Sequence, residues 1–340
     1  MKVLVIAPSY HGYDRSIADG FARLGDEVAV CSHFPHSTFP QKIRNVLSDE
    51  AFPLLGVGVF KQRRIDSFNT HVLSTARAYS PDVVIVVKGD VLHPETVAGL
   101  AKRHRAIYWG YDDPYRYPLV VDSLPFYHAV ASFSRDDTAR LTRDGYNATH
   151  VPLGFDAGVF GSGSAQTIEP APEISFVGAR YPRREALLES AATLGSLGIW
   201  GGDWKRRPWR RRYFEPRGPL DTAFRGPAGL ALSDSIYRSC PVNLNIHGDW
   251  DGLNMRVFEI PGAGGFQLCD SGRGIEQLFE PDKEIVLYSN EVELLEKGAY
   301  YLAHPTQRAR IAEAGQRRAN RDHTLASRAK RLLEIAFADA

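Results

Sequence analysis

Short, uninterrupted apolar runs recur along this chain, and a segment with helical spacing follows almost every one of them. The run Val3–Ala7 precedes the segment Asp14–Leu24, in which Ile17, Phe21 and Leu24 recur at helical intervals. Apolar runs that lack alternating polar residues are typical of strands buried on both faces. Strands that alternate with helices predict parallel sheets of the α/β class.

The alternation continues to the C-terminus with one interruption. Strands are predicted at residues 3–7, 28–31, 82–87, 106–109, 129–133 and 151–153, and again at 174–177, 198–200, 242–246, 266–269 and 285–288. Between the two groups, residues 156–173 are rich in Gly, Ser, Ala and Pro, which indicates an interdomain linker. We therefore predict an α/β fold in which two Rossmann-like domains, residues 1–158 and 170–323, face a central cleft. A last helix, predicted over 324–337, has an apolar stripe that must be buried.

Charge and cysteine content exclude several classes of protein. The 340 residues carry a formal net charge of +1, so no overall field favours nucleic acid. Cys31, Cys240 and Cys269 are too far apart for a zinc site and odd in number, which argues against a disulfide framework. Pro8 stops the opening apolar run before it reaches the length of a signal peptide, and no later run is long enough to span a bilayer. We expect a cytoplasmic protein that binds no nucleic acid and can still make peripheral contact with a membrane.

The strongest candidate site extends from His247 to Glu259. It follows a predicted strand, and a turn that contains Gly252 leads into a short predicted helix near Asn254. Free N–H groups at the start of a helix are suited to bind a diphosphate. Asp251 and Glu259 are eight residues apart, roughly two helical turns. A carboxylate in this position can accept hydrogen bonds from both hydroxyls of a ribose.

The stretch LNMRVFEIPGAGGFQLCD, residues 253–270, resembles the nucleotide-binding segment of GT-B glycosyltransferases, and in particular that of the spore-maturation (CgeB-like) family. The resemblance implies metal-independent transfer of a sugar from a nucleotide-diphosphate sugar, of UDP or dTDP type, to a hydroxyl-bearing glycan, protein or small molecule. It implies no cofactor, a donor bound by the second domain with Glu259 at the ribose, and a last helix packed back on the first domain. Asp251 departs from the Glu usual at its position in the wider retaining family.

Residues after the strands of the second domain are predicted to bind the donor. One of Arg180, Arg183 and Arg184, after the strand that ends before Gly178, can neutralise diphosphate charge, and the loop position favours Arg180. The alternatives are that these arginines form a solvated helix start and that His247 is a buried structural residue. The predicted donor-binding residues are Gly178, Arg180, Arg184, His247, Asp251, Gly252, Leu253, Asn254, Arg256 and Glu259.

Three residues of the first domain are catalytic candidates. His11 follows the first strand, where inverting GT-B enzymes place a His or Asp that deprotonates the acceptor, and an imidazole suits that task near pH 7. Asp112 and Asp113 follow the fourth strand and can orient acceptor hydroxyls or act as a base. The alternatives are that Asp14 or Ser16 caps the helix after His11, and that the aspartates form an Asx turn before the next proline.

Two further patterns and two rival functions remain. Asp249-Trp250-Asp251 has the D-x-D form of a metal site, but it adjoins a helix start that already suits phosphate, so we expect no metal. The basic run 205–212 indicates an exposed loop or, alternatively, contact with an anionic acceptor or membrane phosphate.

The first strand is not followed by a Gly-x-Gly-x-x-Gly turn, which argues against a dehydrogenase. The rivals are a nucleotide-sugar epimerase of the same architecture and a non-catalytic nucleotide-sugar-binding protein.

Overall fold

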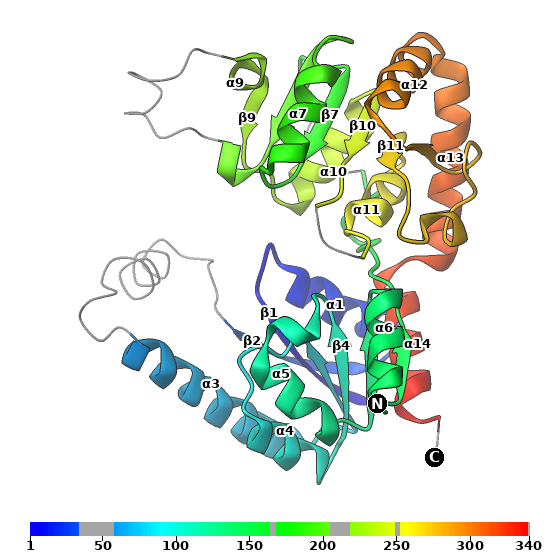
Figure 1. Cartoon of the computed structure of the whole chain (residues 1–340). Helices are drawn as coiled ribbons and strands as arrows, with labels where there is room; N and C mark the ends of the chain where they lie inside the picture. Colours follow the sequence, from blue (N-terminus) through cyan, green and yellow to red (C-terminus); the bar gives the residue numbers. More distant parts are fainter. Residues whose placement is uncertain (34–57, 164–167, 205–217, 249–251, 339–340) are drawn as a thin grey trace. The chain divides into compact units, whose positions relative to one another are not determined.

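A computed structural model describes residues 1–33, 58–163, 168–204, 218–248 and 252–338 of the chain (Figure 1). The chain divides into two compact units. Unit 1 comprises Met1–Leu153 together with Leu325–Ala340, and unit 2 comprises Gly154–Thr324. Unit 1 is thus built from both ends of the chain.

Unit 1 contains a six-stranded parallel sheet in the order β2-β1-β3-β4-β5-β6. Its strands are β1 (Lys2–Pro8), β2 (Glu27–His33), β3 (Val83–Val87), β4 (Arg105–Gly110), β5 (Ala129–Ser132) and β6 (Ala148–His150). Its helices are α1 (Tyr13–Ala22), α3 (Gly58–Tyr79), α4 (Pro94–Ala101), α5 (Pro118–Ser123), α6 (Arg135–Arg143) and α14 (Leu325–Ala336), with short 3-10 turns η1 (Pro114–Arg116) and η2 (Leu124–Phe126). The last strand is 148–150, so the strand predicted at 151–153 is wrong by three residues.

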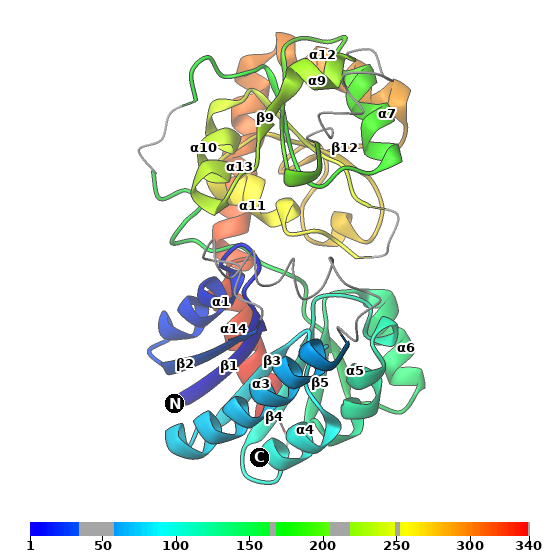
Figure 2. The same cartoon turned by 90° about the vertical axis from the view of Figure 1, so that its left-hand side faces the viewer.

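Alternate residues of the central strands fill a core on each face of this sheet. Val3 and Val5 of β1 pack with α1 and α14 on one face, whereas Leu4 and Ile6 pack with α3 and α4 on the other. Successive side chains of a strand point to opposite faces, so a run that is apolar at every position needs cover on both sides. Figure 2 shows α14 behind the sheet and α3 and α4 in front of it.

The C-terminal helix α14 completes the core of unit 1. Leu325 and Leu332 are buried among strand residues of the sheet, and Arg328 donates from Nε to the carbonyl of Leu153 at 2.9 Å. Gly20 allows α1 to approach α14 closely, because a Cβ at Gly20 would lie 2.9 Å from the backbone of Leu325. A segment from the end of the chain therefore packs directly against the N-terminal helix.

Unit 2 contains a second six-stranded parallel sheet, in the order β12-β11-β10-β7-β8-β9. Its strands are β7 (Ile174–Val177), β8 (Leu197–Trp200), β9 (Phe224–Gly226), β10 (Val242–Asn245), β11 (Gln267–Asp270) and β12 (Val286–Tyr288). Its helices are α7 (Pro182–Ala191), α9 (Pro219–Ala223), α10 (Leu230–Ser239), α11 (Arg256–Ala263), α12 (Glu291–Ala303) and α13 (Pro305–Asp322), with 3-10 turns η3 (Gly202–Trp204) and η4 (Ile275–Gln277). β9, α9 and α10 were not predicted from the sequence.

The segment predicted as an interdomain linker is partly built into unit 2. Phe160 of this segment and Phe155 directly before it are 2% and 0% exposed, and the ring of Phe160 stacks on Tyr237 with the centroids 6.2 Å apart. The N–H of Gly161 donates to Asp234 at 2.8 Å. Glycine-rich composition alone predicts a free linker, but here the two phenylalanines anchor the segment in a core. The boundary predicted at residue 158 accordingly lies at Leu153/Gly154.

None of the described helices combines the length and the hydropathy needed to cross a membrane.

Candidate functional site

The strand order of unit 2 reverses between β7 and β10. The two strands are neighbours in the sheet although β8 and β9 separate them in the sequence. In open α/β sheets, ligands bind outside the carboxyl ends of the strands at such a reversal. Gly178 follows β7, and Ile246–Gly248 follow β10. These two loops therefore define the candidate site.

His247 and Asp270 form a buried pair at this edge of the sheet. Their side chains are 1% and 3% exposed, and Nδ1 of His247 lies 2.5 Å from Oδ1 of Asp270. The backbone N–H of His247 also donates to both carboxylate oxygens at 3.1 Å. Arg183 of α7 donates to Asp270 Oδ2 at 2.8 Å and to the carbonyl of His247 at 3.3 Å. Residues of β11 and α7 thus hold His247 in one orientation.

The surroundings of this pair keep Asp270 ionised and His247 neutral near pH 7. Burial by itself would raise the pKa of Asp270, but hydrogen bonds from His247 and Arg183 outweigh it and hold that pKa below the usual range of an aspartate. Burial lowers the pKa of His247, although the carboxylate of Asp270 opposes this, and the positive charge of Arg273 lowers that pKa further.

Helix α11 is the next helix after His247 along the chain and carries Glu259 in its first turn. The helix starts at Arg256, two residues beyond the predicted position near Asn254, and the side chain of Glu259 is buried. Asn254 donates from Nδ2 to Oδ1 of Asn245 on β10 at 2.8 Å, which connects the strand end to the residues before the helix. Gly252 has φ of 91°, a conformation that glycine adopts without strain.

The predicted arginines of unit 2 have other partners. Arg184 is 2% exposed and donates to the carbonyls of Ile246 and Ala179 at 2.9 and 2.8 Å. Burial lowers its pKa to about 10. Arg180 forms an ion pair with Glu185. Arg183, by contrast, pairs with Asp270, as Arg273 does at 4.0 Å, and the Arg183 side chain is 41% exposed. Of the three alternatives from the sequence, Arg183 is therefore best placed for a ligand.

Several predicted features lie outside the described residues. These are Asp251 of the donor-binding set, the D-x-D sequence at 249–251, and the basic run 205–212. Leu253 is buried beside the start of the helix. Arg256 is the first residue of α11. Burial raises the pKa of the Tyr237 hydroxyl, the charge of Glu259 raises that pKa further, and the charge of Arg256 opposes them.

His247, Cys269 and Asp270 could together offer ligands to a metal, since one side-chain ligand atom of each lies within 4.8 Å of the others. Burial raises the pKa of the Cys269 thiol well above its ordinary value, and a thiol binds a metal as the thiolate. Both oxygens of Asp270 already accept hydrogen bonds. The group is therefore better suited to a hydrogen-bonded pair than to a metal centre.

The strand order of unit 1 also reverses, between β1 and β3. Lys88 follows β3 and has φ of 65°, a left-handed conformation that is uncommon for a residue other than glycine and is often found at functional sites. Its ammonium group lies 2.9 Å from Oδ2 of Asp90, 4.8 Å from the ring centre of Tyr117 and 5.7 Å from that of Tyr10. This cluster was not predicted from the sequence, although Lys-Gly-Asp directly after the apolar run 83–87 was the available signal.

The three catalytic candidates lie at the same edge of unit 1 but have different surroundings. His11 is exposed, with φ of 52°. The residue that caps α1 is Gly12, with no side-chain hydrogen bond, so the alternative that Asp14 or Ser16 caps this helix is wrong. Asp113 accepts a hydrogen bond from the N–H of Tyr115 at 2.9 Å, which confirms the turn that was its alternative interpretation.

Asp112 is held by its neighbours. Its Oδ2 accepts a hydrogen bond from the Tyr117 hydroxyl at 2.6 Å, and its Oδ1 pairs with Arg116 at 3.0 Å. Tyr117 also lies against Lys88, so Asp112 belongs to the cluster around that lysine.

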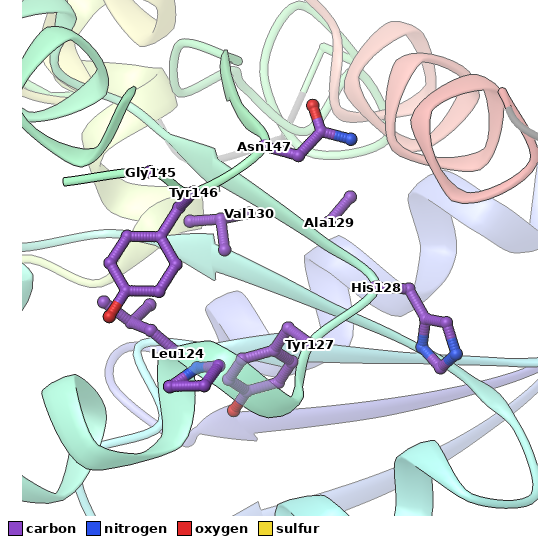
Figure 3. Close-up of a pocket in the computed structure, with 9 residues that line it drawn as sticks. Leu124, Tyr127, His128, Ala129, Val130, Gly145, Tyr146 and Asn147 are labelled. Atoms are coloured by element: carbon purple, nitrogen blue, oxygen red, sulfur yellow. The ribbon is translucent and has the colours of Figure 1, made fainter. Parts of the chain in front are cut away.

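A cavity of about 330 Å³ lies elsewhere in unit 1 (Figure 3). The residues that line it are Leu124, Pro125, Tyr127, His128, Ala129, Val130, Gly145, Tyr146 and Asn147. They precede or begin β5 and β6. The cavity therefore lies at the amino ends of these strands, opposite the edge where the candidate residues gather.

Comparisons with known proteins agree with this architecture. Residues 183–334 match a family described as glycosyl transferase-like. Spore protein CgeB of Bacillus subtilis (strain 168) is 20% identical over 258 residues, which cover 71% of this chain and 78% of that protein. A sucrose-phosphate synthase from Thermosynechococcus elongatus has a similar fold, with a TM-score of 0.65, 13% identity, and coverage of 99% of this chain and 100% of that one. Anabaena Alr3699/HepE in complex with UDP superimposes with a TM-score of 0.63, 13% identity, and the same coverage.

Proposed function

This chain is a glycosyltransferase of the GT-B fold with a CgeB-like sequence, and on that premise we propose that it transfers a sugar from a nucleotide-diphosphate sugar to a hydroxyl-bearing acceptor without a metal ion. The acceptor is a glycan, a protein or a small molecule. The observation that carries the proposal is the arrangement at the strand reversal of unit 2. There His247, which pairs with Asp270, follows β10, and Asn254 connects the end of β10 to the residues before α11, which carries Glu259 in its first turn.

In this proposal unit 2 binds the donor. The positive end of the α11 dipole attracts the diphosphate, and the buried carboxylate of Glu259 accepts both ribose hydroxyls. Gly252 and Asp251, which lies outside the described residues, remain part of the proposed donor-binding set. The Anabaena structure that shares the fold contains UDP, which supports a donor of the UDP type and, through the similar base, of the dTDP type.

Catalysis in this proposal relies on charge stabilisation. Negative charge develops on the diphosphate as the bond to the sugar breaks, and fixed dipoles and cations lower the energy of that state. The groups that we assign to this role are the start of α11 and Arg183, whose exposed guanidinium contacts the pair at the strand reversal. We prefer Arg183 to Arg180 and Arg184 because it contacts the pair at the strand reversal while its side chain stays 41% exposed. Arg184 is buried, and Arg180 pairs with Glu185.

Unit 1 supplies the acceptor side in this proposal. His11 is exposed in the loop after β1 and remains our candidate for the base, whereas the bound carboxylates of Asp112 and Asp113 hold the surrounding loop.

Cys31, Cys240 and Cys269 are free thiols, which supports a reaction in the reducing cytoplasm.

Replacement of Glu259 tests the donor assignment. Loss of a charged hydrogen-bonding group should weaken nucleotide binding by roughly 1.5–3 kcal/mol, or about tenfold to more than a hundredfold in affinity. Titration calorimetry of Glu259→Ala and Glu259→Gln with UDP and dTDP measures this loss, and the glutamine variant preserves the volume of the buried side chain. Glu189→Ala, an exposed position on α7, is the control. Unchanged affinity in both Glu259 variants would remove this residue from the site.

A further inference from the structure

Three buried polar atoms between β10 and α11 have no hydrogen-bond partner in the described part of the chain. They are Nδ2 of Asn245, Nε2 of His247 and Oδ1 of Asn254. Asn245 and His247 are 0% and 1% exposed. Buried polar atoms are nearly always hydrogen-bonded, because an unpartnered one loses its bond to water without compensation. Their gathering at the strand reversal points to a ligand that supplies the missing partners.

Asp270 determines which hydrogen-bonding group His247 offers to that ligand. The carboxylate contacts Nδ1 at 2.5 Å and can only accept a hydrogen bond, so Nδ1 carries the proton. In a neutral imidazole the other nitrogen then has a lone pair and no hydrogen. Nε2 of His247 is accordingly an acceptor.

The charges around His247 favour this neutral form. Arg183 contacts Asp270 and the carbonyl of His247, Arg184 binds the carbonyl of Ile246, and Arg273 binds the carbonyl of Gly248. Asp270 is the single carboxylate among these groups, and it already accepts a hydrogen bond from Arg183. A second proton on His247 would therefore add a positive charge to a buried site that three guanidinium groups surround.

An acceptor nitrogen selects a hydroxyl and rejects a phosphate. Phosphate oxygens of a nucleotide-diphosphate sugar are themselves acceptors, so they gain nothing from a lone pair on Nε2. The donor class carries hydroxyls on its ribose and on the transferred sugar, and the carboxylate of Glu259 suffices for both hydroxyls of the ribose.

We propose that His247, positioned by Asp270, accepts a hydrogen bond from a hydroxyl of the transferred sugar and so selects the sugar of the donor. The inference rests on the proposed function and assigns His247 to the sugar instead of the diphosphate. Asp270 is a positioning residue, because it acts through the imidazole. The amides of Asn245 and Asn254 offer one further donor and one further acceptor at the same strand reversal.

A pair of substitutions separates this role from a structural one. His247→Asn keeps an amide N–H near the position of Nδ1, where it can still bond to Asp270, but removes the acceptor at Nε2. His247→Gln places its amide near the position of Nε2. We expect His247→Asn to bind UDP-glucose or dTDP-glucose roughly three- to tenfold more weakly, the loss of one neutral hydrogen bond. Its affinity for UDP or dTDP should stay within twofold of wild type, and His247→Gln should recover most of the sugar-nucleotide affinity.

The outcomes of this titration are distinct. Unchanged affinity of His247→Asn for the sugar nucleotide overturns the inference, and an equal loss for UDP and UDP-glucose overturns the assignment to the sugar. If the wild-type protein binds neither nucleotides nor sugar nucleotides, the proposed function itself fails. His71→Asn, on the exposed surface of α3, is the matched control for histidine replacement.

The role of Asp270 has a spectroscopic test that needs no ligand. In protein labelled with ¹⁵N at histidine, and with His247→Asn used to assign its signals, His247 should show the tautomer protonated at Nδ1 near pH 7. Asp270→Asn should reduce that preference, because an amide oxygen attracts the N–H less than a carboxylate does. A wild-type ring protonated at Nε2, or at both nitrogens, would refute the proposed orientation.

Discussion

Replacement of Leu332 by alanine should destabilise unit 1, although this residue lies close to the C-terminus of the chain. Leu332 is 0% exposed and packs in the core between one face of the unit 1 sheet and the helices α1 and α14. Removal of a fully buried leucine side chain costs the transfer free energy of the lost atoms and the free energy of the cavity left behind, together about 2–5 kcal/mol. Leu332 has packed neighbours on several elements, so we expect a value within this range.

Hydrogen exchange measured by mass spectrometry can locate the effect. Because the two units have separate cores, peptides from β1 and α1 should lose protection in Leu332→Ala, while peptides from β7 and β10 keep the wild-type rate. Urea denaturation measures the free energy of unfolding. Lys330→Ala, exposed on the same helix, is the control and should change stability by less than about 0.5 kcal/mol. A loss below about 1 kcal/mol in Leu332→Ala, or a loss of protection confined to unit 2, would refute the assignment of α14 to the core of unit 1.

Two further predictions concern pH and metal. Burial lowers the pKa of His33, which is 4% exposed, to about 4, so the unfolded chain takes up the proton first as the pH falls below about 6.5. Unit 1 should therefore lose stability between about pH 6.5 and pH 4, by up to roughly 3 kcal/mol. Urea titrations at several pH values should show a smaller loss in His33→Gln. The same pH dependence in the variant and the wild type would show that His33 does not cause the loss. Sugar transfer should persist in excess EDTA, because cations and helix dipoles of the protein are proposed to stabilise the diphosphate; activity that is lost with the chelator and restored by Mn²⁺ would assign a metal role.

The local pattern of the sequence was sufficient for the fold class and for part of the candidate site. The apolar runs Val3–Ala7 and Val83–Val87 became strands because a run without polar positions has no face to present to water. The parallel arrangement then places the loops after the strands at one edge, which is why the sequence alone singles out His247 and Glu259. Their roles in donor binding remain proposals.

Only the tertiary structure decided which distant residues meet. Asp270 was simply the end of an apolar strand in the sequence, and it became the partner of His247 because β11 lies beside β10. Phe155 and Phe160 lie in a glycine-rich segment, yet they pack in unit 2. Arg183 and Arg184 are adjacent, yet one contacts the pair and the other is bound by carbonyls. Composition and periodicity describe neighbours along the chain, whereas burial, ion pairing and hydrogen bonding depend on the order of strands in the sheet, which long-range packing determines.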